Sequence, residues 1–496
     1  MTRYLSSRLV VTAALAAAMF VAPTARAYAG NEAMLKLLRI LRDRGSITAE
    51  EYEELRLAAE QPEAAPAPAV AAAETPPAPQ APAASPVLPA TTEALATRVQ
   101  ALEAQVAKQD TEIVRKALAN KWYERIGFRG YTQFRFSTAG ASDSGPAVEV
   151  PADRSVSANE TFGIRRGRIV FSGDVTDHLY LYAQSDFNGS TGAADFSLQM
   201  RDLYADIAFD KAKAFRVRLG QSKVPYGWVN MQSSQNRAAF ERPEALNSAV
   251  EGERDYGAYF MWAPPDARTH FRDLVSRGLK GSGDYGVVAI GLYNGQGLNR
   301  PDLNGDPHVI VRGSYPFKLA SGQYVELGVQ AYRGRFVPAT QAITIDGIPL
   351  TPGRDADGVT DERVGLSAVW YPQPFGVEAE WNFGRGPELS DDLRTIDVRS
   401  LQGGYVQASY RRTGTALGTV FPFVRWNYYD GGRKFARNAP HLKVNEVDLG
   451  LEMAKWSEVE LAMVYTRTFT RTRTSAFPYA EAKGINRLGV QVQWNY

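Results

Sequence analysis

Residues 485–496 read INRLGVQVQWNY, and apolar and polar side chains alternate along this stretch. One set consists of Leu488, Val490, Val492, Trp494 and Tyr496, and the other of Arg487, Gly489, Gln491, Gln493 and Asn495. Because successive side chains of a β-strand point to opposite faces, one face of this strand suits lipid and the other suits water. The aromatic residues suit the interface between membrane and water. The stretch therefore predicts a strand of a transmembrane β-barrel.

The same two-residue period extends back to residue 121. It predicts sixteen strands, at 126–137, 161–174, 178–188, 198–210, 214–221, 254–262, 285–293, 308–316, 323–333, 360–371, 375–384, 399–411, 420–428, 445–455, 458–468 and 485–496. We therefore expect residues 121–496 to form an all-β transmembrane barrel of about sixteen antiparallel strands. A short helical and coiled-coil segment is expected to precede it.

The connections between the predicted strands alternate between short and long. The short ones include 174–177, 210–213, 316–322, 371–374 and 455–458, and the long ones include 137–160, 222–253, 334–359, 385–398 and 470–483. Outer-membrane barrels have short periplasmic turns and long extracellular loops. This asymmetry predicts that the protein lies in the cell outer membrane, with its N-terminal segment in the periplasm. Residues 263–284 break the rule, since they are long where a short turn is expected.

The first 120 residues divide into four segments of different composition. Residues 1–27 carry arginines, an apolar run and a small-x-small site, which together predict a cleaved signal peptide. Residues 28–60 predict a helical hairpin, 61–90 an Ala/Pro linker, and 91–120 a coiled coil with heptad spacing. The hairpin is compatible with a docking module for a periplasmic or cell-wall partner and equally with a small folded spacer.

Composition and motifs exclude several classes of function. The chain contains no cysteine, so disulfides, thiolate metal sites and cysteine nucleophiles are excluded. Its net charge of +2 gives no support to a nucleic-acid partner. None of the four histidines lies in a Gly-x-Ser-x-Gly context or has His-Glu-x-x-His spacing. We therefore expect neither an enzyme nor a bound cofactor.

Several stretches resemble the family of phosphate- and pyrophosphate-selective outer-membrane porins. They are GFRGY at 127–131, FGIRRGR at 162–168, RDLYAD at 201–206, RLGQSKVPYG at 218–227 and LYNG at 292–295. The resemblance covers roughly residues 121–496. It implies a trimeric barrel of sixteen strands whose third long loop, here 222–253, folds inward to constrict the pore. The heptads of 91–120 have β-branched residues at their a positions, which favours a coiled coil of two helices, one from each of two chains. A trimer needs three, and we expect the barrel to set the number of chains at three.

Arg165 and Arg166 are adjacent in a predicted strand, so strict alternation would turn one of them towards lipid. An arginine that faces lipid near the midplane costs about 2–4 kcal/mol. A bulge at the neighbouring Gly167 would turn both inward. Rings of Arg or Lys select anions in pores, and the resemblance implies such a basic ladder along the wall. The alternative is that these arginines pair with barrel carboxylates such as Asp202 and Asp206.

Further candidate residues lie in or near the predicted constriction loop. By resemblance, Lys223 supplies a positive charge at the narrowest point, and Arg218 lies on the preceding strand. Arg237 and Arg242 lie within the loop, together with the acidic Glu241. Because the loop carries both signs of charge, the expected preference for anions is moderate.

The sequence therefore predicts an outer-membrane porin for passive diffusion of small hydrophilic solutes, favouring anions such as phosphate or polyphosphate. Its expected partners are outer-membrane lipid and lipopolysaccharide, small anions, and two further copies of the chain in a homotrimer. Two alternatives stay open. In the first, the barrel is a structural anchor that tethers the envelope through residues 28–120. In the second, it is a hydrolase embedded in the outer membrane.

Overall fold

The computed structural model describes residues 53, 121–138, 161–188, 197–345, 347–472 and 480–496. The signal peptide, the linker and the coiled coil predicted within residues 1–120 lie outside these residues, and the predicted hairpin is described only at Glu53. The described strands all belong to the compact unit formed by residues 92–496. Among the described residues, no helix is both long and apolar enough to span a bilayer.

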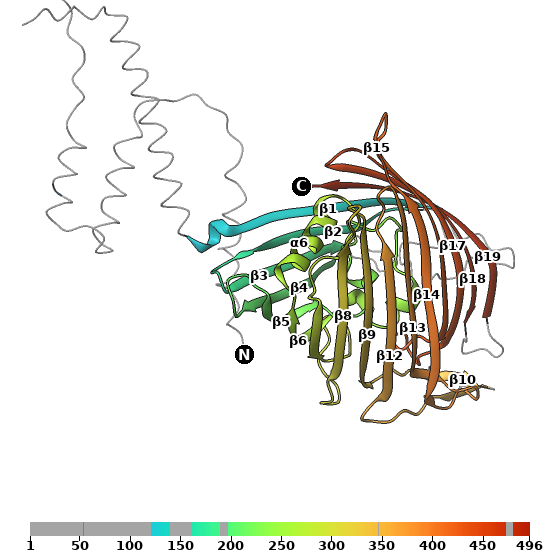
Figure 1. The fold of residues 1–496 in the computed structure, drawn as a ribbon. Coiled ribbons are helices and arrows are strands. Elements are labelled where there is room, and N and C mark those ends of the chain that lie inside the picture. The colour runs from blue at the N-terminus through green and yellow to red at the C-terminus, as the bar shows by residue number, and fades with distance from the viewer. Residues whose placement is uncertain (1–52, 54–120, 139–160, 189–196, 346, 473–479) are drawn as a thin grey trace, which may run out of the picture. The chain divides into compact units, whose positions relative to one another are not determined.

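In the described part of the chain, sixteen long antiparallel strands form a closed barrel (Figure 1). They are β1 (Ile126–Ser137), β2 (Thr161–Asp174), β3 (Leu179–Asn188), β4 (Ser197–Ala208), β5 (Phe215–Lys223), β6 (Arg254–Trp262), β7 (Val288–Tyr293), β8 (His308–Lys318), β9 (Tyr324–Phe336), β12 (Val359–Trp370), β13 (Phe375–Leu389), β14 (Ile396–Tyr410), β16 (Gly418–Gly432), β17 (His441–Trp456), β18 (Val459–Thr472) and β19 (Ala480–Asn495). Each long strand pairs with the next one in sequence. The predicted fold class is therefore confirmed.

Strands β1 and β19 close the barrel by pairing with each other. Tyr131 lies opposite Asn495 in this register. The backbone of Gly130 extends the pairing, because its N–H donates to the Tyr496 carbonyl at 2.6 Å and its carbonyl accepts from the Tyr496 N–H at 3.0 Å. A Cβ on Gly130 would lie 2.4 Å from a ring atom of Tyr496. Glycine is therefore required where the two strands meet.

The alternation that predicted the strands separates the outer surface from the lumen. On β19, Leu488 and Trp494 are exposed, whereas Gln491 and Gln493 are buried. The polar face thus points into the barrel and the apolar face points outward, where lipid solvates it. This is the arrangement that a transmembrane barrel requires.

The shorter elements lie in the connections. They are η1 (Trp122–Arg125), α4 (Trp228–Met231), α5 (Glu244–Asn247), η2 (Glu251–Glu253), α6 (Pro265–Ser276), β10 (Ile343–Ile345), β11 (Ile348–Leu350) and β15 (Arg412–Thr415). The sequence predicted neither the β10–β11 hairpin nor β15, which pairs with β16. We call the end of the barrel with the β2–β3, β4–β5 and β17–β18 turns the short-turn end, and the opposite end the long-loop end. The unexplained segment 263–284 lies at the short-turn end and contains α6.

Candidate pore constriction and its lining

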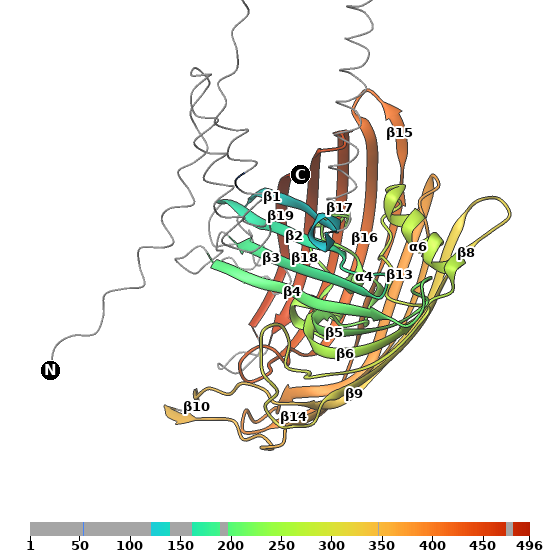
Figure 2. The ribbon, with the colours of Figure 1, turned by 90° about the vertical axis from the view of Figure 1, so that its left-hand side faces the viewer.

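Residues 224–253 connect β5 to β6 and fold into the lumen, and we call them the inner loop. They contain α4, which Figure 2 shows among the strands, together with α5 and η2. Trp228 is only 1% exposed, and it packs in a buried cluster with Tyr226 and Leu246. The predicted third long loop therefore lies inside the barrel.

One side of the inner loop is fixed to strands β12 and β13. The backbone N–H groups of Trp228 and Val229 donate to the Glu380 carboxylate at 2.7 and 3.2 Å. The first N–H groups of a helix have no partner within the helix, so Glu380 satisfies two such donors of α4. Arg363 donates to the side-chain oxygen of Ser248 at 2.9 Å and to its carbonyl at 3.0 Å.

The other side of the inner loop is fixed by Glu241, which binds three arginines of β1 and β2. Its carboxylate accepts from Arg135 at 3.0 Å, from Arg165 at 2.9 and 3.1 Å, and from Arg166 at 2.7 Å. Both adjacent arginines reach it because the β1–β2 register shifts here. Gln133 pairs with Arg166 and the next residue of β1 pairs with Ile164, so Arg165 is the extra residue of a bulge.

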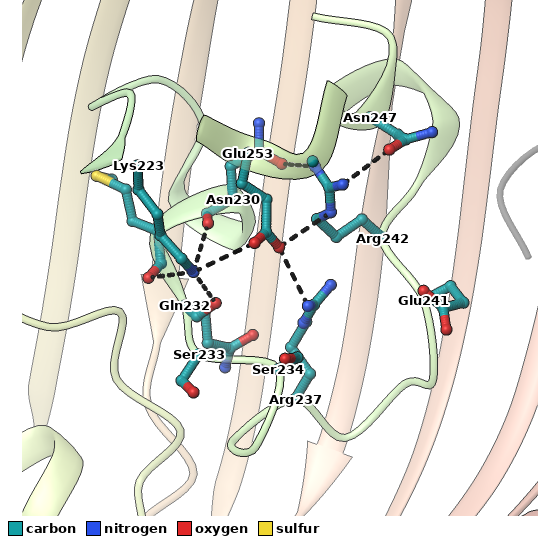
Figure 3. Close-up of polar contacts among 12 residues, drawn as sticks. Lys223, Asn230, Gln232, Ser233, Ser234, Arg237, Glu241, Arg242, Asn247 and Glu253 are labelled. Atoms are coloured by element: carbon teal, nitrogen blue, oxygen red, sulfur yellow. Dashed lines mark hydrogen bonds and ion pairs between the residues drawn. The ribbon is translucent and has the colours of Figure 1, made fainter. Parts of the chain in front are cut away.

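A second buried carboxylate, Glu253, lies at the base of the inner loop and contacts four cations among the described residues. Figure 3 shows three of them, Lys223, Arg237 and Arg242. Arg237 and Arg242 each lie 3.1 Å from its Oε1, and the Lys223 amine lies 3.6 Å from its Oε2. Arg254 on β6 forms an ion pair with the same carboxylate. Glu253 is 2% exposed and has a positive φ of 71°, a conformation that non-glycine residues rarely adopt.

Lys223 also holds the C-terminal end of α4. Its amine donates to the carbonyls of Asn230 at 2.9 Å, Met231 at 3.1 Å and Gln232 at 2.7 Å. The last carbonyls of a helix lack partners within it, and a cation near them is favourable. Lys223 therefore joins the end of β5 to the inner loop through both charge and hydrogen bonds.

Cations and carboxylates also pair along the barrel wall. Arg218 on β5 makes a bidentate pair with Asp206 on β4, at 2.7 and 2.9 Å. Arg254 donates to Asp202 at 2.9 Å. The guanidinium of Arg218 also lies 3.9 Å from the ring centroid of Tyr204, within cation–π range. These pairs fix the positions of the charges on the β4–β6 wall.

The carboxyl groups of Glu241 and Glu253 are ionised over a wide pH range. Burial alone would raise the pKa of each group, but the surrounding cations outweigh it and hold both pKa values well below the usual range. A carboxylate with a lowered pKa stabilises the fold above its unfolded-state pKa, and this contribution is lost only as the pH falls through the folded-state pKa. Both ion clusters are therefore intact at neutral and mildly acidic pH.

A cavity of about 650 Å³ lies between the inner loop and the wall formed by β1–β6. Of the described residues, eight Lys or Arg and four Asp line it. The cations are Arg129, Arg168, Lys213, Arg216, Arg218, Lys223, Arg254 and Arg268, and the anions are Asp174, Asp202, Asp206 and Asp284. The lining thus carries more positive than negative charge.

The structure distributes the predicted site residues over three places. Arg218, Lys223 and Asp202 line the cavity. Arg237 and Arg242 meet Lys223 at Glu253, whose role the sequence did not reveal. Arg165 and Arg166 meet at Glu241, whereas Asp202 and Asp206, their suggested partners, bind Arg254 and Arg218. Within the described part of the chain, Arg165, Arg166, Arg237 and Arg242 lie outside the cavity lining.

Comparisons with known proteins identify a family for this chain. The family model for phosphate-selective porin O and P matches residues 147–434. Comparison with curated proteins gives no match. Similar solved structures include the outer-membrane channel DcaP of Acinetobacter baumannii (13% identity, 75% of this chain and 97% of that chain, TM-score 0.45) and an anion-selective porin from Comamonas acidovorans (11%, 75% and 99%, TM-score 0.41). Because both TM-scores lie below 0.5, the family match is the informative one.

Proposed function

Because the chain belongs to the phosphate-selective porin O and P family and forms an outer-membrane channel, we propose that small hydrophilic solutes diffuse passively through it and that anions are favoured. The excess of Lys and Arg in the cavity lining supports this proposal. Basic side chains along a pore raise the local concentration of anions. Since many of these side chains also pair with carboxylates, we expect a moderate preference.

Phosphate and polyphosphate are the anions that we propose as favoured solutes. Arginine presents a planar fork of donors that matches the oxygens of phosphate. Six arginines in the described part of the chain line the cavity, among them Arg168, Arg216, Arg218 and Arg254. The solutes would pass the inner loop and reach these side chains in the cavity beneath it.

The reversal potential of the purified protein in a planar bilayer under a KCl gradient tests this proposal. We expect anion selectivity, and we expect Arg218→Met to lower the anion-to-cation permeability ratio about fivefold. A unit charge some 8 Å away in water stabilises an anion by ~0.5 kcal/mol and destabilises a cation by the same amount, so its loss changes the ratio by ~1 kcal/mol. Block by micromolar phosphate would support the phosphate proposal, whereas cation selectivity would contradict the preference for anions.

A matched control is Arg399→Met on β14. The side chain of Arg399 is 40% exposed and pairs with Asp391 and Asp397. Neither Arg399 nor these two carboxylates are among the described residues that line the cavity. The same loss of charge at this position is expected to leave the reversal potential unchanged. An equal shift in both variants would show that overall charge, and not the lining, sets the selectivity.

We propose that the long-loop end faces the outside and the short-turn end faces the periplasm, as in other outer-membrane barrels. The N-terminal segment then lies in the periplasm, where residues 28–60 are available to a periplasmic or cell-wall partner. We further propose a homotrimer, which the heptads of residues 91–120 would help to hold together.

Deleting residues 28–120 behind an intact signal peptide tests these proposals. We expect unchanged single-channel conductance, because the described barrel contains none of the deleted residues. The molecular mass in detergent reports whether the trimer needs the heptads. Normal conductance combined with a loss of envelope integrity would favour the structural tether as an additional role.

The family match supports a channel without catalytic activity, and this is what we propose. His178 and His270 each lie within 2.9 Å of a backbone carbonyl oxygen. His308 lies 3.5 Å from a carboxylate oxygen of Asp361, and His441 lies 3.1 Å from a carboxylate oxygen of Glu388. A carboxylate beside a histidine occurs in catalytic triads as well as in structural ion pairs, so the test is direct: hydrolysis of lipid or peptide by the purified protein would contradict the proposal.

A further inference from the structure

The β6–β7 connection is long at the end of the barrel where the turns are short. It begins with α6 and continues through residues 277–287, which we call the strap; their sequence is RGLKGSGDYGV. Figure 1 places α6 at the end of the barrel where the C-terminus lies. The predicted channel function does not account for this segment.

Helix α6 is held at the rim of the barrel by contacts with β8 and β9. The Tyr324 hydroxyl donates to Asp273 at 3.0 Å, and the Tyr315 hydroxyl donates to Asp266 at 2.7 Å. Phe271 and Leu274 are buried, at 1% and 0% exposure. These contacts fix the point from which the strap starts.

The strap reaches the opposite wall of the barrel. The Lys280 amine lies 2.5 Å from the Glu452 carboxylate on β17 and 5.3 Å from the ring centroid of Phe421 on β16. Six strands separate β7 from β17 in one direction around the described barrel, and seven separate β6 from β17 in the other. Lys280 and Glu452 therefore join two nearly diametrically opposed walls across the lumen.

The strap returns to its own wall through Asp284. This carboxylate accepts from Arg216 on β5 at 2.7 Å and lies 3.0 Å from Arg268 on α6. The path requires unusual backbone conformations, since φ is positive at Gly278, Lys280, Gly283 and Gly286. Glycine adopts such values without a steric penalty.

The strap and the inner loop bound the same cavity. Met231 and Gln235 of the inner loop line it, as do Ser282 and Tyr285 of the strap. The two segments also touch, because the side chain of Gln232 donates to the Lys280 carbonyl at 2.7 Å. A solute that enters from the long-loop end and passes the inner loop meets the strap next.

We propose that the strap is a second constriction of the channel, in series with the inner loop, and that the Lys280–Glu452 ion pair holds it across the lumen. The proposal rests on the channel function. Burial alone would lower the pKa of Lys280, but Glu452 and other carboxylates raise it above its usual value, so the amine is charged at neutral pH and can keep the strap in place.

Lys280→Met keeps an unbranched side chain that is one atom shorter and removes the charge that anchors the strap. If the two constrictions contribute equal resistances in series, releasing one raises the single-channel conductance about twofold. Lys455→Met is the matched control, because Lys455 is exposed near the β17–β18 turn. The control is expected to conduct like the wild type.

A second variant tests the strap without weakening its anchor. Since the chain contains no cysteine, Ser282→Cys introduces a single thiol into the cavity lining. Modification with a negatively charged methanethiosulfonate is expected to lower both conductance and anion selectivity. Ile348→Cys, at the exposed β10–β11 hairpin, is the modification control and is expected to show no change.

The proposed second constriction requires the expected result from both Lys280→Met and Ser282→Cys. Wild-type conductance in Lys280→Met, or unchanged current after modification of Ser282→Cys, would overturn the proposed second constriction. Either outcome would contradict the second constriction alone, and the proposed channel function and its selectivity would still stand. The absence of any channel activity in the wild-type protein would instead contradict the proposed function.

Discussion

Replacing Glu253 with glutamine is expected to loosen the base of the inner loop and to make the channel more strongly anion-selective. Among the described residues, four cations share this carboxylate in a buried cluster, and Figure 3 shows Lys223, Arg237 and Arg242 around it. Removing one partner of a buried ion pair costs about 3–5 kcal/mol, because the remaining charge stays uncompensated. Arg254 lines the cavity and arginine stays charged, so its positive charge would act on the permeating ions. The reversal potential and the midpoint of urea unfolding measure the two effects.

Glu251→Gln is the matched control for this variant. It is the same substitution two residues away in the same loop. Glu251 forms an ion pair with Arg300, whose side chain is 46% exposed. Exposed ion pairs contribute about 0–1 kcal/mol, so we expect little change in stability or selectivity. Equal effects in Glu253→Gln and Glu251→Gln would show that the buried cluster does not hold the inner loop.

Replacing Glu241 with glutamine is expected to release the other side of the inner loop and to increase the single-channel conductance. Arg135, Arg165 and Arg166 would lose a common counter-ion that lies within 3.1 Å of each of them. The loop would then lose the ion pairs that hold it against β1 and β2, because a neutral amide does not attract these guanidinium groups as a carboxylate does. Unchanged conductance and unchanged current noise would contradict the role of Glu241 as an anchor.

Acidification would remove the charge of Glu241 only at a pH below the usual range for a glutamate. Because the pKa of Glu241 lies well below its usual value, its ion pairs persist at the pH where an ordinary glutamate is half protonated. The wild-type channel is therefore expected to keep its neutral-pH conductance down to about pH 4.3, the unperturbed value for glutamate. A conductance change centred at or above that pH would contradict the lowered pKa.

The strands were predictable because a transmembrane barrel imposes a local pattern on the sequence. The predicted bounds 126–137 and 161–174 coincide with β1 and β2, where lipid outside and a polar lumen inside enforce alternation. At β7 the prediction began at residue 285, whereas the strand begins at Val288, because Tyr285 faces the cavity as part of the strap. Alternation alone does not distinguish a residue in the wall from one that crosses the lumen.

The ion clusters were not predictable, because their partners are distant in sequence. Glu241 binds arginines that precede it by 75 to 106 positions. The sequence did identify the cations Lys223, Arg237 and Arg242, but it gave no sign that Glu253 would gather them. A lone glutamate at the end of a loop carries no local pattern, since its role depends on which strands the barrel brings beside it.

The seam between β1 and β19 also determines how the barrel must assemble. Gln133 and Gln493 hydrogen-bond across it at 2.7 Å, although they are 360 positions apart. Neighbouring hairpins form over short distances, whereas the entropic cost of closing a loop grows with its length. We therefore expect the seam to be the last pairing to form, with β1 and β19 presenting unpaired edges until then that invite pairing with other chains. The rate at which these two strands meet sets how long the folding protein is vulnerable to aggregation.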